Sequence, residues 1–131
     1  MIIDTDFVIL YLKKDPKTLE KFRELIENNK QSKIYTTHVS AWELYRGAYI
    51  SSRKEENLRK INKFLSYLPI LPFTEEIDKR FGMLFVKLEN DGKRIGVMDT
   101  LIASIALEYN LPVVTRNVKH FEKTEVMIET W

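Results

Sequence analysis

The chain opens with the stretch MIIDTDFVILYL, residues 1–12, and this stretch decides the fold class. Residues 1–4 are mostly apolar and end on Asp4, a pattern typical of a short buried strand. The apolar run Phe7–Leu12 follows after only two residues and predicts a helix. A buried strand that passes directly into a helix is typical of α/β proteins with a parallel sheet.

The same alternation continues along the rest of the chain. Leucine, isoleucine and phenylalanine recur every three to four residues in 19–26, 58–68 and 77–88, and residues 101–109 are apolar nearly all round, which predicts a central helix. Four further runs resemble strands: residues 33–36, 70–72, 113–115 and 126–129. We therefore expect one domain over residues 1–131, a three-layer α/β/α sandwich with a short, mostly parallel five-stranded central sheet.

Composition excludes several classes of protein. Of the 131 residues, 44% are hydrophobic and only eight are Gly or Pro, which excludes a disordered or low-complexity chain. The absence of Cys excludes disulfides and thiolate zinc sites. The longest apolar run, Phe7–Leu12, is too short for a membrane helix, and no signal peptide is visible, so we expect a cytoplasmic protein. The net charge of +2 neither requires nor excludes a nucleic-acid partner.

Three carboxylates occupy positions that this topology can bring together. Asp4 ends the first strand, Glu43 lies early in the helix predicted over residues 41–50, and Asp99 precedes the apolar helix. Ligands of open parallel sheets bind beyond the carboxyl ends of the strands. Converging carboxylates repel one another unless a cation joins them, and their oxygens suit Mg²⁺ or Mn²⁺. The pattern therefore favours metal-assisted hydrolysis of a phosphodiester.

Each of these residues also has a purely structural interpretation. Asp4 and Asp99 can cap the helices that follow them, and Ser40-x-x-Glu43 reads as a capping box that opens the helix at residue 41. Asn117 follows a strand, where an amide can cap a turn or orient a metal-bound water. Spacing alone leaves both interpretations open.

Four segments together resemble a PIN-domain ribonuclease, and more closely the VapC toxins of toxin–antitoxin pairs. They are IIDTD (2–6), SAWELYRGA (40–48), IGVMDTLIA (95–103) and VTRNVKHF (114–121). The resemblance covers essentially the whole chain, with the segments in the family's order and spacing.

The resemblance implies an endoribonuclease that depends on Mg²⁺, for which Mn²⁺ can substitute. Asp4, Glu43 and Asp99 correspond to the family's catalytic acids and metal ligands. Asn117 stands where the family often has a fourth Asp, which leaves the number of bound metal ions open. Thr115 and Asp6 are implied as supporting polar groups. The family also implies a homodimer and an antitoxin protein whose C-terminal segment lies over the active site.

An RNA substrate needs basic side chains around the acidic centre. Those nearest the motifs are Arg46, Arg94, Arg116 and Lys119. The pairs Lys13–Lys14 and Arg53–Lys54 read instead as ordinary helix-end cations.

Three aromatic residues, Trp42, Tyr45 and Tyr49, share one helix face. They can form a base-stacking platform, although a buried apolar face is the more common use of such a stripe.

Two other functions fit parts of the sequence. The stretch DTDFVI, residues 4–9, matches the opening motif of haloacid-dehalogenase-like phosphatases, with Asp4 as nucleophile and Asp6 as acid/base. That family needs a later Lys and a paired-acid motif, and no clear paired-acid motif follows a strand here. A non-catalytic PIN-like module that only binds RNA or protein would have a broken acidic set, whereas all three acids are present.

Overall fold

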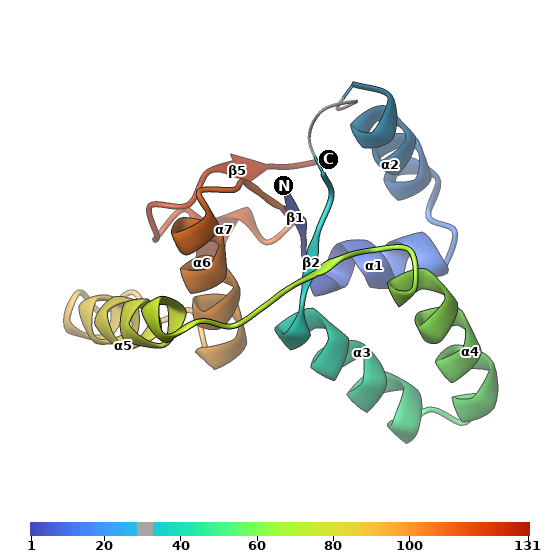
Figure 1. Ribbon diagram of the computed structural model, residues 1–131, viewed down its shortest axis with the longest axis horizontal. Coiled ribbons are helices and arrows are strands. Elements are labelled where there is room, and N and C mark those ends of the chain that lie inside the picture. Colours follow the sequence, from blue (N-terminus) through green and yellow to red (C-terminus); the bar gives the residue numbers. More distant parts are fainter. Residues whose placement is uncertain (29–32) are drawn as a thin grey trace.

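The computed structural model describes residues 1–28 and 33–131. Helices and strands alternate along the chain as predicted (Figure 1). In order they are β1 (Ile2–Ile3), α1 (Thr5–Leu12), α2 (Pro16–Asn28), β2 (Thr36–Thr37), α3 (His38–Ile50), α4 (Lys54–Leu65), β3 (Ile70–Leu71), α5 (Glu75–Asn90), α6 (Val97–Tyr109), β4 (Val113–Val114), α7 (Val118–Phe121) and β5 (Ile128–Glu129). All five strands fall in or beside the predicted runs.

The strands form a parallel sheet with β1 at its centre. β4 pairs with both β1 and β5, and β2 pairs with β3. The two parts are joined where the amide of Ile3 donates to the carbonyl of Tyr35 and the amide of Tyr35 donates to the carbonyl of Met1, both at 2.9 Å. The spatial order is therefore β3-β2-β1-β4-β5. The strand order reverses direction at β1, so the carboxyl ends of β1 and β4 mark the position where such sheets bind ligands.

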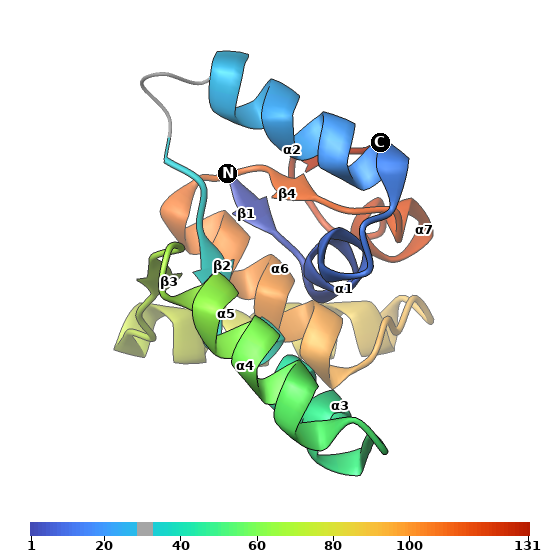
Figure 2. The ribbon, with the colours of Figure 1, turned by 90° about the vertical axis from the view of Figure 1, so that its right-hand side faces the viewer.

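Successive residues of the central strands face opposite layers, as the two-residue period of a strand requires. Ile2 and Val113 pack with the buried side chains of α5, α6 and α7. Ile3 and Val114 pack with those of α1, α2 and α4. Figure 1 shows these two groups of helices on either side of the strands, and Figure 2 views the molecule from the side of α1, α2 and α4. The predicted three-layer sandwich is confirmed, with α6 buried between the sheet and α5.

Two predicted helix starts are wrong. The hydroxyl of Thr37 accepts the amide of Ser40 at 3.1 Å, so α3 begins at His38, and Ser40 with Glu43 is not a capping box. β2 passes into α3 without a linker, and Thr37 reaches the cap position three residues earlier than Ser40 does. α6 begins at Val97 behind Gly96, whose φ of 89° ends the preceding loop, so Asp99 lies inside the first turn and does not cap it.

The first helix begins as predicted. Oδ1 of Asp4 accepts the amide of Phe7 at 2.9 Å and caps α1. No helix within residues 1–28 and 33–131 is long and apolar enough to cross a membrane.

Candidate active site

Asp4 is a buried carboxyl group at the carboxyl end of the central strand. Only 5% of the residue is exposed, and this burial is the main reason why the pKa of Asp4 rises to about 6. Hydrogen bonds from the Thr115 hydroxyl and the Phe7 amide oppose the rise, while the negative charges of Asp6 and Asp99 add to it. Asp4, Asp6 and Asp99 therefore lie close enough to influence one another, and Thr115 lies beside them.

Asp99 is held in place by the short helix α7 and the residue before it. Its Oδ2 accepts a hydrogen bond from Nδ2 of Asn117 at 3.0 Å and lies 2.6 Å from Nδ1 of His120. The backbone amide of Asn117 donates a hydrogen bond to the Thr115 hydroxyl at 2.9 Å. Asn117 precedes α7, but its side chain makes no cap bond. The side-chain amide of Asn117 therefore holds Asp99 in position. The Oδ1 atom of Asp99 has no hydrogen-bond partner among the described residues.

His120 is a site residue that the sequence analysis missed. It lies within the segment VTRNVKHF, three residues after Asn117, and the single turn of α7 places both side chains on Asp99. The i, i+3 spacing was the available signal, because residues three apart face the same side of a helix.

Glu43 reaches the start of α1. Its Oε2 accepts a hydrogen bond from the hydroxyl of Thr5, the residue directly after Asp4. Because Glu43 plays no part in capping α3, its carboxylate is available for this contact. Thr5 is the second residue that the sequence analysis missed as a functional partner, since it read only as part of the Asp-Thr-Asp motif.

The donor set is of the kind that Mg²⁺ prefers, with carboxylate oxygens from separate elements. Among the described residues, no three His, Asp or Glu side chains stand close enough together to hold an ion jointly. The charge of Asp99 acts on the pKa of Asp4, while Glu43 is engaged with Thr5. Mg²⁺ is commonly held by one or two carboxylates plus waters and substrate phosphates, so this pair fits such an ion.

The basic residues expected to contact RNA differ in how free they are. Arg94 pairs with Glu89 at 2.9 Å. Arg116 pairs with Asp15 at 3.1 Å, and its guanidinium lies 4.7 Å from the ring centre of Trp131. The remaining two, Arg46 and Lys119, are exposed and make no ion pair with any other described residue.

The aromatic stripe of α3 is only partly buried. Tyr45 packs into the core, and its hydroxyl donates to Asn62 at 2.7 Å. Trp42 is 49% exposed and stacks on Phe73 at 5.8 Å between ring centres, and Tyr49 is 63% exposed. Burial of the whole stripe, the favoured interpretation, is wrong, because only Tyr45 packs against the core.

The chain is thus an α/β protein with a parallel sheet of order β3-β2-β1-β4-β5. Its candidate acids lie after β1 and at the start of α6. The chain belongs to the PIN domain family, which matches residues 1–126. It is 33% identical to ribonuclease VapC2 of Rickettsia felis over 99% of this chain and 96% of that protein. It is 30% identical to the tRNA(fMet)-specific endonuclease VapC of Salmonella typhimurium, with the same coverage.

Solved structures agree. The VapBC2 structure from Rickettsia felis, bound to a DNA fragment from its promoter, superposes with a TM-score of 0.88 at 32% identity, covering 99% of this chain and 97% of that chain. The phosphatase alternative finds no support in these similarities.

Proposed function

We propose that this protein is a metal-dependent endoribonuclease and the toxin of a toxin–antitoxin pair. The observation that carries the proposal is the set of hydrogen bonds that links Asp4 to Asp99 at the carboxyl end of β4: Thr115 bonds to Asp4, and Asn117 bonds to both Thr115 and Asp99. Relatives named as ribonucleases, alike over almost the full length of both chains, support the same activity.

Asp4 and Asp99 are the pair that would hold Mg²⁺ or Mn²⁺, and Glu43, anchored by Thr5 beside Asp4, is proposed as the third acid of the site. When bound, the ion supplies Lewis-acid chemistry: it lowers the pKa of water and offsets negative charge on the phosphoryl group. The chain's own residues prepare this site. Asn117 and His120 fix Oδ2 of Asp99, and Oδ1 has no hydrogen-bond partner among the described residues and would be the atom offered to a ligand. Further support comes from the Thr115 hydroxyl beside Asp4, and Asp6 adds negative charge at the rim.

Transfer RNA is the first substrate to test. One relative at 30% identity is named for cleavage of tRNA(fMet). We further propose that Arg46 and Lys119, both exposed and unpaired among the described residues, contact the RNA backbone near the acids. Arg94 and Arg116 would have to leave their ion pairs with Glu89 and Asp15 to do so.

Partner proteins belong to the same proposal. Solved relatives are VapBC complexes, which supports a cognate antitoxin for this chain. A homodimer is the second proposed assembly, supported by apolar side chains exposed on two helices: Trp42, Tyr49 and Ile50 on α3, and Met83 and Val86 on α5. Light scattering on the purified protein tests the dimer.

Cleavage of labelled tRNA with Mg²⁺ or with EDTA tests the activity. We expect cleavage by the wild type with Mg²⁺, and a loss of several orders of magnitude with EDTA or in Asp99→Asn. The matched control is Asp91→Asn, because Asp91 is an exposed acid at the end of α5. This variant should cleave tRNA like the wild type. Equal cleavage with and without metal, or full activity in folded Asp99→Asn, contradicts the proposal.

A further inference from the structure

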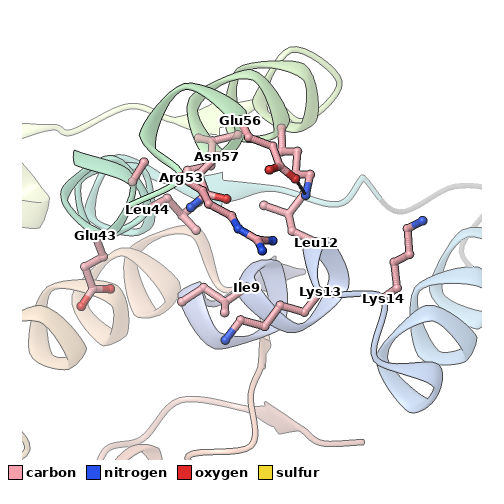
Figure 3. Close-up of a pocket in the computed structure, with 13 residues that line it drawn as sticks. Ile9, Leu12, Lys13, Lys14, Glu43, Leu44, Arg53, Glu56 and Asn57 are labelled. Atoms are coloured by element: carbon pink, nitrogen blue, oxygen red, sulfur yellow. Dashed lines mark hydrogen bonds and ion pairs between the residues drawn. The ribbon is translucent and has the colours of Figure 1, made fainter. Parts of the chain in front are cut away.

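A cavity of about 530 Å³ opens between α1, α3 and α4, beside the proposed catalytic acids (Figure 3). Its apolar surface comes from all three helices, with Ile9, Leu44 and Ile61 among the lining side chains. Glu43 lies at one end of the cavity and bonds to Thr5, the residue after Asp4, so this end of the cavity is the one nearest the proposed site. This volume is typical of ligand sites in proteins.

The rim of the cavity is basic. Lys13, Lys14 and Arg53 line it and make no ion pair with another described residue, whereas Lys60 is neutralised by Glu56 at 2.7 Å. Figure 3 shows the Arg53 and Lys13 side chains on opposite sides of the space, from the start of α4 and the end of α1. Three cations without an ion pair among the described residues lie around an apolar floor, against one acid without such a pair, Glu43, at one end. This lining suits a ligand that has both negative charge and flat apolar surface.

Two lining residues are unusual for their backbone positions. Lys14 has a φ of 61°, a left-handed conformation that usually falls to Gly or Asn after a helix. Gly47 lies inside α3, although a Cβ atom there would meet nothing within 4 Å. Helix geometry and packing therefore favour other residues at both positions. Lys14 instead places a charge on the rim, and Gly47 leaves the cavity open. Both features point to a ligand.

We propose that this cavity holds the stretch of single-stranded RNA next to the phosphate that is cut. Lys13, Lys14 and Arg53 contact backbone phosphates, and the apolar floor contacts a base or ribose. The inference rests on the proposed ribonuclease function and adds the path that the substrate takes away from the acids, between α1 and α4. Charge decides the occupant: a polyanion complements the unpaired cations better than an apolar peptide does.

Removal of charge is the first test. Lys13→Gln/Arg53→Gln is compared with Lys17→Gln/Arg23→Gln, which removes one Lys and one Arg, exposed and without ion pairs among the described residues, from α2. Binding of a short fluorescent single-stranded RNA is measured by anisotropy with EDTA over a salt series. The cavity variant should flatten the plot of log Kd against log salt by about 1.4, since each phosphate contact of a single strand contributes roughly 0.7. The α2 variant should keep the wild-type slope.

Bulk without charge is the second test. Gly47→Leu fills the cavity, and Gly82→Leu on α5 is its matched control, because a Cβ atom at either glycine meets nothing within 4 Å. Leu is a strong helix former, so both variants should fold. We expect Gly47→Leu to weaken RNA binding about tenfold or more, and Gly82→Leu to bind like the wild type.

The outcomes separate this inference from the proposed function. Cleavage of RNA by the wild type with Mg²⁺, together with losses confined to the two cavity variants, supports the RNA path. If the wild type cleaves RNA but the cavity variants bind it as their controls do, the inference is wrong and the cavity is left to a protein partner. If the wild type neither binds nor cleaves RNA, the proposed function itself fails.

Discussion

At the scale of single residues, Asp4 combines two roles that conflict in the absence of a cation. Its side chain caps α1, which stabilises the helix, yet burial raises the pKa of the same carboxyl group to about 6. An Asp that only capped a helix would gain from being charged. The burial is therefore better explained by a ligand than by the cap.

The pKa of Asp4 predicts a pH-dependent stability. Because the pKa in the folded state exceeds the ordinary value of 3.8, the folded protein holds a proton that the unfolded chain has lost between pH 4 and 6. The free energy of unfolding should therefore fall across this window by up to about 3 kcal/mol. Asp4→Asn keeps a capping oxygen but cannot ionise, so with EDTA it should exceed the wild type in stability above pH 6. Denaturant unfolding of both proteins at pH 4, 5, 6 and 7 measures this difference. If the free energies of unfolding of the two proteins change in parallel with pH, the pKa of Asp4 is not raised.

The contact between Thr5 and Glu43 predicts a second effect. Thr5→Val keeps the side-chain shape but removes the hydroxyl that holds Glu43. Loss of a bond that orients a metal ligand typically costs 10–100-fold in activity, and we expect tRNA cleavage with Mg²⁺ to fall by about that factor. Thr130→Val, at an exposed Thr, is the control. Unchanged cleavage in folded Thr5→Val would show that Glu43 needs no such anchor.

The sequence singled out three candidate acids but did not indicate how they are held. Asp4, Glu43 and Asp99 stand out because charged groups flank apolar segments. Their partners Thr5 and His120 do not. Thr5 follows Asp4 as an ordinary helix residue, and the i, i+3 spacing of Asn117 and His120 indicates a shared face without indicating what that face contacts. Asn117 looked like a cap or a water ligand, and only the packing of α7 against α6 shows that it bonds to Asp99.

At the scale of elements, α3 carries both a strong start and a weak interior. Thr37 caps it and Ser40 supplies the amide. Thr37→Val should therefore destabilise the protein by about 1 kcal/mol, as loss of an N-cap typically does, and Ser40→Ala should cost less because the amide of Ser40 remains. Thermal unfolding of the two variants measures the difference. A larger loss of stability in Ser40→Ala than in Thr37→Val would mean that Ser40, and not Thr37, caps the helix.

The interior glycine of α3 predicts the opposite sign. Gly47→Ala should stabilise the protein by about 0.5–1 kcal/mol, because Gly is costly within a helix and the added Cβ atom meets nothing within 4 Å. Gly82→Ala in α5 should gain as much. Chemical denaturation of both variants checks this. A loss of stability in Gly47→Ala alone would mean that Gly47 has a packing role.

Helix starts were less predictable than helix bodies, for a physical reason. Apolar spacing fixed the bodies of α2, α4, α5 and α6, whereas several capping residues compete within a few positions of each start. Ser40 and Thr37 both fit a cap, and the connection to β2 decides between them. At α6, a glycine with positive φ supplies the start and leaves Asp99 inside the helix.

At the scale of the whole molecule, the strand order creates the site. Pairing of β1 with β4 brings Asp4 beside Thr115. Asp99 comes from the first turn of α6, in the helix layer that packs against these strands. The sequence predicts that strands alternate with helices, but not which strands pair, because each strand is only two residues long. The cavity between α1, α3 and α4 was equally hidden, since Lys13 and Arg53 look like ordinary helix-end cations.

Thermal unfolding with and without Mn²⁺ tests most directly whether Asp4 and Asp99 hold a cation together. The account predicts that Mn²⁺ raises the melting temperature of the wild type, with a stabilisation of about 2.7 kcal/mol at a hundredfold excess over Kd. Asp91→Asn should respond equally, because Asp91 is the residue that ends α5 and belongs to no part of the proposed site. Asp99→Asn should barely respond, and with EDTA it should melt at or above the wild type because one repulsive charge is gone. An equal response to Mn²⁺ in all three proteins would contradict the account.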